Sequence, residues 1–415
     1  MSDARQRSDA MPAGTDVAIV GAGIVGLATA YRLLERLPDL RVTVLEKEAD
    51  VAMHQSGHNS GVVHAGIYYA PGSLKARLCA EGKADLERFA ERHDIPLEHC
   101  GKLIVAVTDD ELPRLASLRE RATANAVPGL EEVSPERIRE IEPHAAGIGG
   151  LWSPTTGIVD FRRVSLAYAA EVRGRGGSIV LGAEVRSIQA RGGQHVLETT
   201  LGTVSARAVV TCAGLHSDRV AAMTGPTDGV APQIVPFRGD YYTLTPEARR
   251  LVRGLLYPVP DPRFPFLGVH FTRRIDGEVW AGPNAVLAFA REGYRRRDVS
   301  PRDMAETLAY PGFLRLARRY LRTGMAEMWR DVSKPAFVAE LRRFIPEIGA
   351  TDLVSGPSGV RAQALNRDGS LADDFVLDEG DAVLHVRNAP SPAATSSLAI
   401  GRVLAETAIE RFGLA

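Results

Sequence analysis

Three glycines and one glutamate near the start of the chain have the types and the spacing that binding a dinucleotide requires. The glycines lie in the stretch GAGIVG, at Gly21, Gly23 and Gly26, and Glu46 follows 20 residues after the last of them. The first glycine permits a tight turn, the second lets the backbone approach a pyrophosphate, and the third lets a helix pack closely on a strand. A carboxylate at Glu46 can accept hydrogen bonds from ribose hydroxyls. The combination predicts a dinucleotide site rather than a glycine-rich turn that only packs.

The elements that position these residues are predicted to be a strand, a helix and a second strand. Apolar runs at 17–20 and 42–45 predict buried strands, and the pattern over 27–34 predicts the helix. Because the helix begins at the glycine turn, its N-terminus offers free N–H groups and the positive end of its dipole to a pyrophosphate. Small polar residues follow at 56–66, and a loop of this composition can lie flat against a ligand.

Composition and charge exclude several classes of protein. The length of 415 residues suggests two domains, and 45% hydrophobic with 24% charged residues is typical of a globular protein. A net charge of -1 provides no global field for nucleic acid. The three cysteines lack CxxC spacing, which argues against a disulfide framework or a zinc site and fits a reducing compartment. We therefore expect no metal site.

The sequence predicts neither secretion nor membrane crossing. No apolar run approaches the roughly 20 residues that span a bilayer. Residues 1–15 are polar and lack the apolar core of a secretory signal. We therefore expect the protein in the cytoplasm, while peripheral attachment to the inner face of the membrane and the oligomeric state stay open.

The order of the predicted elements indicates an α/β protein whose Rossmann-like, FAD-binding domain is discontinuous. Aromatic residues alternate between 232 and 283, which is typical of a half-buried sheet in an inserted α+β substrate domain that is mostly antiparallel. A nicotinamide-dependent dehydrogenase usually keeps its dinucleotide unit contiguous, whereas an interleaved layout fits a flavoprotein. The predicted segments are a disordered tail at 1–15, the dinucleotide-binding domain at 16–90, 151–225 and 350–415, and the substrate domain at 91–150 and 226–349.

Motifs along the whole chain are more specific than the glycine turn. They are HQSGHNSGVVHAGIYY at 54–69, CGKL at 100–103, RGDYY at 238–242, GVRAQ at 359–363, DDF at 373–375 and NAPSPAATSS at 388–397. With these motifs the chain resembles the FAD-dependent oxidoreductases of the D-amino-acid oxidase type, and within them the L-2-hydroxyglutarate oxidases and dehydrogenases. The resemblance implies oxidation of L-2-hydroxyglutarate to 2-oxoglutarate, with hydride transfer from C2 to flavin N5. No histidine or cysteine lies in a context for covalent attachment, so we expect noncovalent FAD.

The residues expected to hold FAD belong to the glycine turn, the small polar loop and the ends of later strands. Ser56, Asn59 and Ser60 can reach the pyrophosphate or the ribityl chain. The N-terminus of the last helix could stabilise negative charge at flavin N1 and O2. The complete expected set is Gly21, Gly23, Ile24, Val25, Gly26, Glu46, Lys47, Ser56, His58, Asn59, Ser60, Gly61, Val185, Ala213, Gly214, Gly359, Arg361, Ser396 and Ser397.

A 2-hydroxy diacid needs cations for two carboxylates. We expect Arg361 to bind one of them, because its guanidinium forms a bidentate fork and it lies where related amino-acid oxidases place their substrate arginine. Arg238 and Lys102 are candidates for the far carboxylate, although Arg238 could instead pair with Asp240. Further polar candidates for substrate contact are Tyr69, Tyr242 and Asn284.

The oxidation also needs a base for the hydroxyl proton. Histidine suits this task near pH 7. His64 lies in the loop predicted to face the flavin, and His270 lies on a strand of the predicted substrate sheet. The sequence leaves the choice between the two histidines open.

Two other functions remain compatible with the sequence. An amine or amino-acid oxidase of the glycine or sarcosine type would need the same arginine but no second cation. A regulatory or scaffold protein that only binds a dinucleotide would reduce no flavin. The sequence does not select the electron acceptor among oxygen, a membrane quinone and an electron-transfer flavoprotein.

Overall fold

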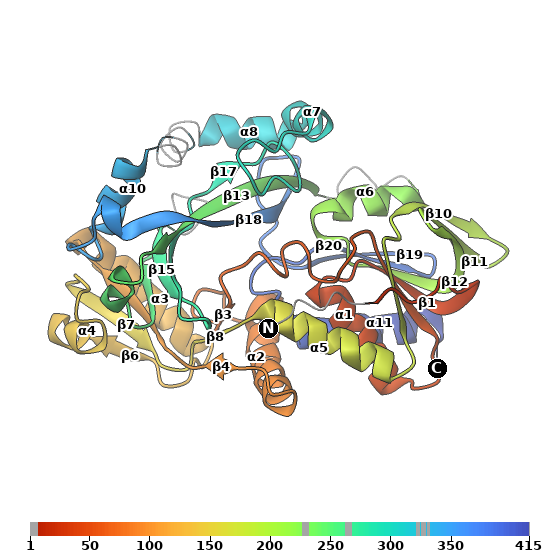
Figure 1. The fold of residues 1–415 in the computed structure, drawn as a ribbon, viewed down its shortest axis with the longest axis horizontal. Helices are drawn as coiled ribbons and strands as arrows, with labels where there is room; N and C mark the ends of the chain where they lie inside the picture. The colour runs from red at the N-terminus through yellow and green to blue at the C-terminus, as the bar shows by residue number, and fades with distance from the viewer. Residues whose placement is uncertain are drawn as a thin grey trace.

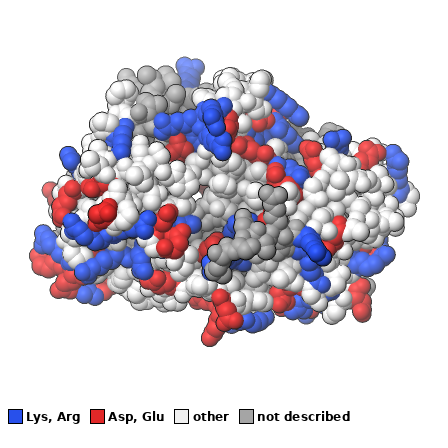
Figure 2. Space-filling view, viewed as in Figure 1, with Lys and Arg blue, Asp and Glu red and all other residues white. Residues whose placement is uncertain are grey.

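The computed structural model contains two large β-sheets (Figure 1). The structure describes residues 7–225, 232–261, 268–320, 324, 329 and 333–414. One sheet carries the predicted dinucleotide unit, and the other is built from middle segments of the chain. Side chains of both charges are interspersed on the face shown in Figure 2, so this face presents no single-sign field.

The first sheet has a parallel centre whose strands run in the order β9-β2-β1-β12-β20. Its members are β1 (Gly14–Val20), β2 (Val42–Glu46), β9 (Ser178–Leu181), β12 (Gly202–Thr211) and β20 (Val383–Asn388). Antiparallel additions are β10 (Val185–Arg191), β11 (Gln194–Thr199) and β19 (Val376–Gly380). The apolar run at 17–20 is buried throughout, as a central parallel strand covered on both faces requires. The predicted α/β class is confirmed.

Helices α1 (Ile24–Arg36), α5 (Phe161–Gly174) and α11 (Ser397–Phe412) pack together against this sheet (Figure 1). The chain before β1 also joins the sheet, although residues 1–15 were expected to be disordered. Asp9 exchanges hydrogen bonds with Ile179 of β9, and Ser8 Oγ accepts one from Leu181 N. Residues 1–6 lie outside the described residues.

The second sheet runs in the order β17-β13-β16-β15-β14-β5-β7-β6, with β18 paired to β13. Every pair is antiparallel except β14 with β5. Its strands are β5 (Lys102–Ala106), β6 (Glu131–Val133), β7 (Gly149–Ser153), β13 (Gln233–Leu244), β14 (Leu255–Pro258), β15 (His270–Arg273), β16 (Val279–Gly282), β17 (Val286–Leu287) and β18 (Leu353–Leu365). Strands β7 and β18 lie near the predicted domain boundaries at 150 and 350, and both pair within this sheet. The division into domains stays a prediction.

The remaining elements connect and cover the two sheets. A small sheet joins β3 (Val62–Val63), β8 (Gly157–Val159) and β4 (Leu97–Glu98). The other helices of more than five residues in the described ranges are α2 (Leu74–Arg92), α3 (Leu112–Ala124), α4 (Pro135–Ile141), α7 (Pro301–Ala309), α8 (Pro311–Arg319) and α10 (Lys334–Leu341). Among the described residues, none of the helices combines the length and the apolar character needed to cross a bilayer.

A close contact between α11 and α1 depends on Gly401. A Cβ at this position would lie 2.7 Å from the backbone of Ala28, which cannot move without shifting α1. We expect Gly401→Ala to lower the free energy of unfolding by about 2 kcal/mol, as overpacking of a close-packed interior does. The control is Gly174→Ala, near the C-terminus of α5, where a Cβ would meet no atom within 4 Å. Thermal unfolding of the two variants should show a lower Tm for Gly401→Ala alone, and equal Tm values would contradict the packing argument.

Candidate active site

One cavity of about 1080 Å³ lies between the carboxyl ends of the parallel strands and the second sheet. The first sheet contributes the residues that follow β1, β2, β12 and β20. The second sheet contributes Tyr241, Tyr257, His270 and Arg361. The carboxyl edge of a parallel sheet is where α/β proteins bind nucleotides, so the cavity joins a nucleotide position to a wall with ionisable side chains.

The glycine turn has the geometry of a phosphate cradle. Gly21 has φ of 105°, and a Cβ there would lie 2.5 Å from the carbonyl oxygen of Cys212. A Cβ at Gly26 would overlap the carbonyl oxygen of Gly21, so Gly26 holds the turn without lining the cavity. Ile24 N donates a hydrogen bond of 2.9 Å to Ser56 Oγ at the N-terminus of α1. The turn and the small polar loop therefore meet where a pyrophosphate would bind.

Glu46 is fixed at the edge of the same cavity. Its side chain accepts hydrogen bonds from Ala22 N at 2.6 Å and from Glu48 N at 3.0 Å. The residue is largely buried at the end of β2, yet it lines the cavity. Both bonds hold the carboxylate in one orientation. Its oxygens keep further lone pairs that can accept hydrogen bonds from ribose hydroxyls. These residues fit a bound dinucleotide such as FAD.

Most of the expected FAD-binding residues line the cavity. The exceptions are Gly26, Ser396 and Ser397. Ser397 Oγ shares a hydrogen bond of 3.1 Å with Tyr168 Oη, and Ser396 Oγ is buried with no hydrogen-bond partner among the described residues. Asn59 bonds the backbone of its own loop at Gln55, Ser56 and Gly61, so it shapes this loop. Contact of these residues with FAD stays a prediction.

The register of the second sheet brings Lys102, Tyr257 and His270 to one face. Leu255 pairs with Lys102 across β14 and β5, and Leu256 pairs with Phe271 across β14 and β15. Leu256 and Phe271 point to the opposite face of the sheet, where they form a hydrophobic core with α10. Side chains alternate along strands, so the three polar residues share the face toward the cavity.

His270 is held in one tautomer and one orientation. Nδ1 lies 2.9 Å from the carbonyl oxygen of Gly268, and because a carbonyl only accepts, Nδ1 carries the proton and Nε2 keeps its lone pair. The ring stacks on Tyr257 with 3.9 Å between ring centroids. Burial lowers the pKa of His270 to about 3, and the charges of Lys102 and Arg361 act in the same direction. The imidazole is therefore neutral and can accept a proton.

His64 lines the same end of the cavity. Its backbone N–H donates a hydrogen bond of 3.1 Å to Thr395 Oγ1, which links the small polar loop to the segment before α11. Burial lowers the pKa of His64 well below its ordinary value, and the charge of Lys102 adds to this effect. Both candidate bases are thus neutral and close to the same lysine.

Lys102 is almost completely buried, with 1% of its surface exposed. Its Nζ lies 4.1 Å from the ring centroid of Tyr257 and 5.2 Å from that of Tyr68. Burial lowers the pKa of Lys102 to about 7. The lysine lies against the cavity wall formed by Tyr257 and is not itself a lining residue.

Arg361 lies on β18, opposite Phe237 of β13, and lines the cavity. Its charge adds to the lowering of the pKa of His270 and opposes the rise that burial causes in the pKa of Tyr241, so it lies in the same electrostatic neighbourhood as both side chains. A Cβ on the nearby Gly359 would lie 2.8 Å from the carbonyl oxygen of His58. This close approach brings β18 against the small polar loop and places Arg361 beside the nucleotide end of the cavity.

Five of the six expected substrate residues, Lys102 among them, do not line this cavity. Arg238 Nε donates to Asp240 Oδ1 at 2.9 Å, so the alternative pairing named for it is confirmed. Asn284 Oδ1 accepts a hydrogen bond from Asp240 N. Tyr242 packs on Phe337 in the core of the opposite face, with 4.9 Å between ring centroids. Tyr69 hydrogen-bonds Ser391, which lines the cavity. Contact of these five residues with the substrate stays a prediction.

Sequence reasoning missed three tyrosines at this end of the molecule. Tyr241 and Tyr257 line the cavity, and Tyr68 lies against Lys102. The register of β13 shifts between residues 240 and 242, which decides that Tyr241 rather than Tyr242 faces the cavity. The aromatic alternation indicated a sheet, but such a shift leaves no mark in the sequence that would tell the two tyrosines apart.

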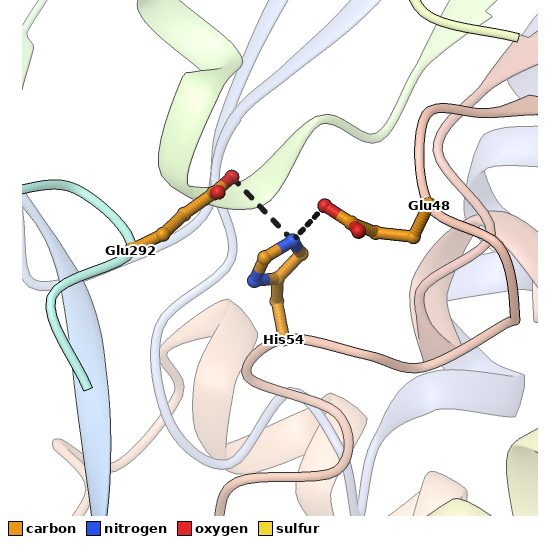
Figure 3. A group of neighbouring side chains, drawn as sticks. All are labelled: Glu48, His54 and Glu292. Carbon is orange, nitrogen blue, oxygen red and sulfur yellow. Dashed lines mark hydrogen bonds and ion pairs between the residues drawn. The ribbon is translucent and has the colours of Figure 1, made fainter. Parts of the chain in front are cut away.

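Charged side chains cluster at the nucleotide end of the cavity, which Lys47, His54 and Glu292 line. Figure 3 shows His54 between Glu48 and Glu292. His54 Nε2 lies 2.9 Å from Glu48 Oε1 and 3.4 Å from Glu292 Oε1. Lys47 forms ion pairs with the same two carboxylates. Glu48, His54 and Glu292 are close enough to hold a metal ion, but the ammonium group of Lys47 already contacts the oxygens that a metal would need. The cluster is therefore an ion-pair network that ties the segment after β17 to the first sheet.

Glu292 is the acid whose titration should report on this network. Burial alone would raise its pKa, but hydrogen bonds from His216 and Lys47 outweigh burial and lower the pKa to about 2, against an ordinary value of 4.5. A carboxylate whose pKa is lowered in the folded state stabilises the fold at pH values above its ordinary pKa. This stability is lost as the pH falls toward the pKa of the folded state. We expect wild type to exceed Glu292→Gln in thermal stability at pH 6, with the difference shrinking between pH 4.5 and pH 2. A difference in Tm that is constant over this range would contradict the role of the ionised carboxylate.

Comparison with known proteins adds a family to this geometry. The family model described as FAD dependent oxidoreductase matches residues 16–407. The chain is 53% identical over 418 residues to "L-2-hydroxyglutarate dehydrogenase, mitochondrial" of Nematostella vectensis, covering 96% of this chain and 91% of that relative. It is 50% identical to the human protein of the same name, covering 96% and 89%, and 44% identical to "L-2-hydroxyglutarate dehydrogenase" of Escherichia coli, covering 93% and 91%.

Solved structures share the fold at lower identity. The FAD-bound L-alpha-glycerophosphate oxidase of Mycoplasma pneumoniae has a TM-score of 0.76 at 22% identity, covering 96% of this chain and 95% of that chain. Glycine oxidase of Geobacillus kaustophilus has a TM-score of 0.69 at 21% identity, covering 96% and 95%. At this level of identity the likeness shows the fold alone.

Proposed function

Because this chain belongs to the FAD-dependent oxidoreductase family, we propose that it oxidises L-2-hydroxyglutarate to 2-oxoglutarate. The relatives that carry this substrate in their names cover nearly the whole chain. The observation that carries the proposal is the single cavity that joins the glycine cradle to Arg361 and His270. The cavity can therefore hold a nucleotide and a small acid side by side, next to the cation of Arg361 and the neutral imidazole of His270.

The chain's own residues would hold the cofactor at the first sheet. The glycine turn and Ser56 receive the pyrophosphate, and Glu46 receives the ribose hydroxyls. The chemistry that bound FAD would supply is acceptance of the hydride that leaves C2 of the substrate. No cysteine or histidine is assigned to a covalent bond, so we propose that FAD is held noncovalently.

Arg361 would orient the substrate. Its guanidinium offers two parallel N–H donors to the carboxylate beside C2. A bidentate contact restricts rotation of this carboxylate, and it therefore fixes which face of C2 is presented. The same arginine would serve a 2-amino acid, so Arg361 selects a 2-substituted acid without selecting the hydroxyl.

His270 would act as the base. Its Nε2 accepts the proton of the 2-hydroxyl while the C2–H bond breaks and the carbonyl of 2-oxoglutarate forms. The bond from Nδ1 to Gly268 keeps Nε2 free of its own proton, and stacking on Tyr257 holds the ring in place. His64 lies on the same wall and would shape the cavity around the hydroxyl.

The test is a substrate panel with the purified, FAD-loaded protein and an artificial electron acceptor. L-2-hydroxyglutarate should be oxidised, whereas its D-enantiomer, glycine and sarcosine should give rates at least about 100-fold lower, because stereochemistry and the second carboxylate both contribute to binding. Oxidation of glycine or sarcosine without oxidation of the hydroxy acid would replace this proposal with an amine oxidase.

Molecular oxygen and a membrane quinone remain the two proposed acceptors. Enzyme reduced by substrate should be reoxidised quickly by one of them and slowly by the other in stopped-flow experiments. Fast reaction with oxygen fits an oxidase in the cytoplasm. Fast reaction with a quinone fits a dehydrogenase at the inner face of a membrane.

A further inference from the structure

We infer that Lys102 and Tyr68 form a buried carboxylate-binding position at the His64–His270 end of the cavity, and that Lys102 takes up a proton when a dicarboxylate binds. The inference rests on the proposed function, since it assigns the second carboxylate of that substrate. It adds Tyr68, which sequence reasoning did not select, and a change of protonation that accompanies binding.

Two buried polar groups at this position lack partners. Lys102 forms no hydrogen bond or ion pair within the part of the chain that the structure describes, and its Nζ faces aromatic rings instead. Tyr68 Oη is buried and has no hydrogen-bond partner among the same residues. Buried polar groups in folded proteins are nearly always bonded, so two unbonded donors beside each other indicate a place for an acceptor.

Among the described residues, no carboxylate acts on Lys102 that could serve as this acceptor. Ser153 of β7 pairs with Lys102, but its hydroxyl already shares a hydrogen bond with Thr156. The titratable groups near Lys102 are His64 and Tyr68 from the loop after β3, Cys79 from α2, Cys100 before β5, Tyr257 from β14 and His270 from β15, and Lys75 and Arg361 act in turn on His64 and His270. An anion that enters from the cavity would therefore be the first negative charge near the lysine.

The side chain of Tyr257 separates Lys102 from the cavity. The strand order β15-β14-β5 places His270 and Lys102 on opposite sides of Tyr257, and both Tyr257 and His270 line the cavity. A dicarboxylate held at one end by Arg361 would extend its second carboxylate toward this wall. Because neither Lys102 nor Tyr68 lines the cavity, the ring of Tyr257 would turn aside, and the two residues would then donate charge-assisted hydrogen bonds to this carboxylate.

Protonation of Lys102 should follow the ligand. A buried amine without an anion tends to lose its proton, and the pKa of Lys102 is lowered by burial to about 7. A carboxylate nearby stabilises the ammonium form, so above pH 7 the complex takes one proton from solvent. A monocarboxylate leaves this position empty and should bind without proton uptake. Lys102 would thus determine the preference for dicarboxylates.

The test uses the oxidised, FAD-loaded enzyme with glutarate and butyrate, which lack a 2-hydroxyl and cannot reduce the flavin. Calorimetry in two buffers of different ionisation enthalpy gives both affinity and proton uptake at pH 6 and pH 8. The variants are Lys102→Met and Tyr68→Phe. Lys83→Met is the matched control, because Lys83 is paired with Glu87 on α2.

We expect wild type to bind glutarate at least tenfold more tightly than butyrate. Binding of one glutarate should be accompanied by uptake of about one proton at pH 8 and of about a tenth of a proton at pH 6, as a group with a pKa near 7 in the free enzyme requires. Lys102→Met should weaken glutarate binding at least tenfold, abolish proton uptake and change butyrate binding less than threefold. Tyr68→Phe should weaken glutarate binding severalfold and keep the proton uptake.

Equal loss of glutarate and butyrate binding in Lys102→Met would overturn the inference, because the lysine would then serve the whole site. Proton uptake that persists in Lys102→Met would overturn it as well. Proton uptake that occurs only when the ligand-free enzyme is photoreduced would also overturn the inference. The protonation of Lys102 would then follow reduction of the flavin and not ligand binding. Failure of L-2-hydroxyglutarate to reduce the flavin would refute the proposed function, while the Lys102-dependent preference for glutarate could still be measured.

Discussion

Replacement of His270 by glutamine is expected to lower kcat for L-2-hydroxyglutarate about 10³-fold, because a positioned base contributes about 10²–10⁴-fold. The side chain lies at the cavity with Nε2 unprotonated and its ring fixed by Gly268 and Tyr257. Glutamine preserves a polar side chain but cannot accept the proton. Steady-state kinetics at pH 7.5, with the FAD content checked from the visible absorbance, measure this loss.

His64→Gln is the matched comparison for the choice of base. His64 lines the same wall, is also neutral, and has no equivalent hydrogen bond to its ring within the described ranges that would fix its tautomer. We expect its kcat to fall less than about tenfold, as for a group that only shapes the site. If the larger loss occurred in His64→Gln, the roles of the two histidines would be reversed and the assignment based on the tautomer would be wrong.

Replacement of Arg361 by methionine is expected to lower kcat/KM for L-2-hydroxyglutarate about 10³-fold. Hydrogen bonds to charged groups contribute about 1.5–3 kcal/mol each, so loss of a bidentate pair costs about 4 kcal/mol. Because the contact orients the substrate as well as binding it, kcat should fall together with a rise in KM.

Arg361→Lys separates charge from geometry at this position. Lysine keeps the charge but not the planar fork, so we expect kcat/KM between those of wild type and Arg361→Met. Both variants should retain FAD, since the glycine cradle and Glu46 are unchanged. Full activity of Arg361→Met would show that another cation binds the carboxylate beside C2.

The dinucleotide unit was predictable from the sequence because its requirements are local. Steric demands at Gly21 and Gly26 arise from atoms a few residues away or from the neighbouring strand, and the position of Glu46 follows from strand, helix and strand lengths. The α/β class and the mostly antiparallel second sheet were predicted from the apolar runs and the aromatic alternation. These features depend on periodicity, which a single sequence displays directly.

The substrate wall was harder to predict because it depends on pairings between distant segments. Lys102 and Tyr68 come together only after β5 pairs with β14 and the loop after β3 packs beside it. The shift in β13 that turns Tyr241 toward the cavity follows from its pairing with β18. Such pairings are tertiary events, and one sequence gives no direct measure of them.

The ion-pair network at the nucleotide end shows the same limit. Lys47 was among the residues expected beside the cofactor, and it does line the cavity. Its partner Glu292 comes from a segment 245 residues later in the chain. Neither residue belongs to a motif that would connect them, so the network could be recognised only from the structure.

An anaerobic absorbance titration of the FAD-loaded protein with L-2-hydroxyglutarate tests the central claim most directly. The account predicts that the flavin band bleaches with this acid and not with its D-enantiomer, glycine or sarcosine. It also predicts that one 2-oxoglutarate forms for each flavin reduced. A flavin that stays oxidised with L-2-hydroxyglutarate, or a protein that cannot be loaded with FAD, would contradict the account.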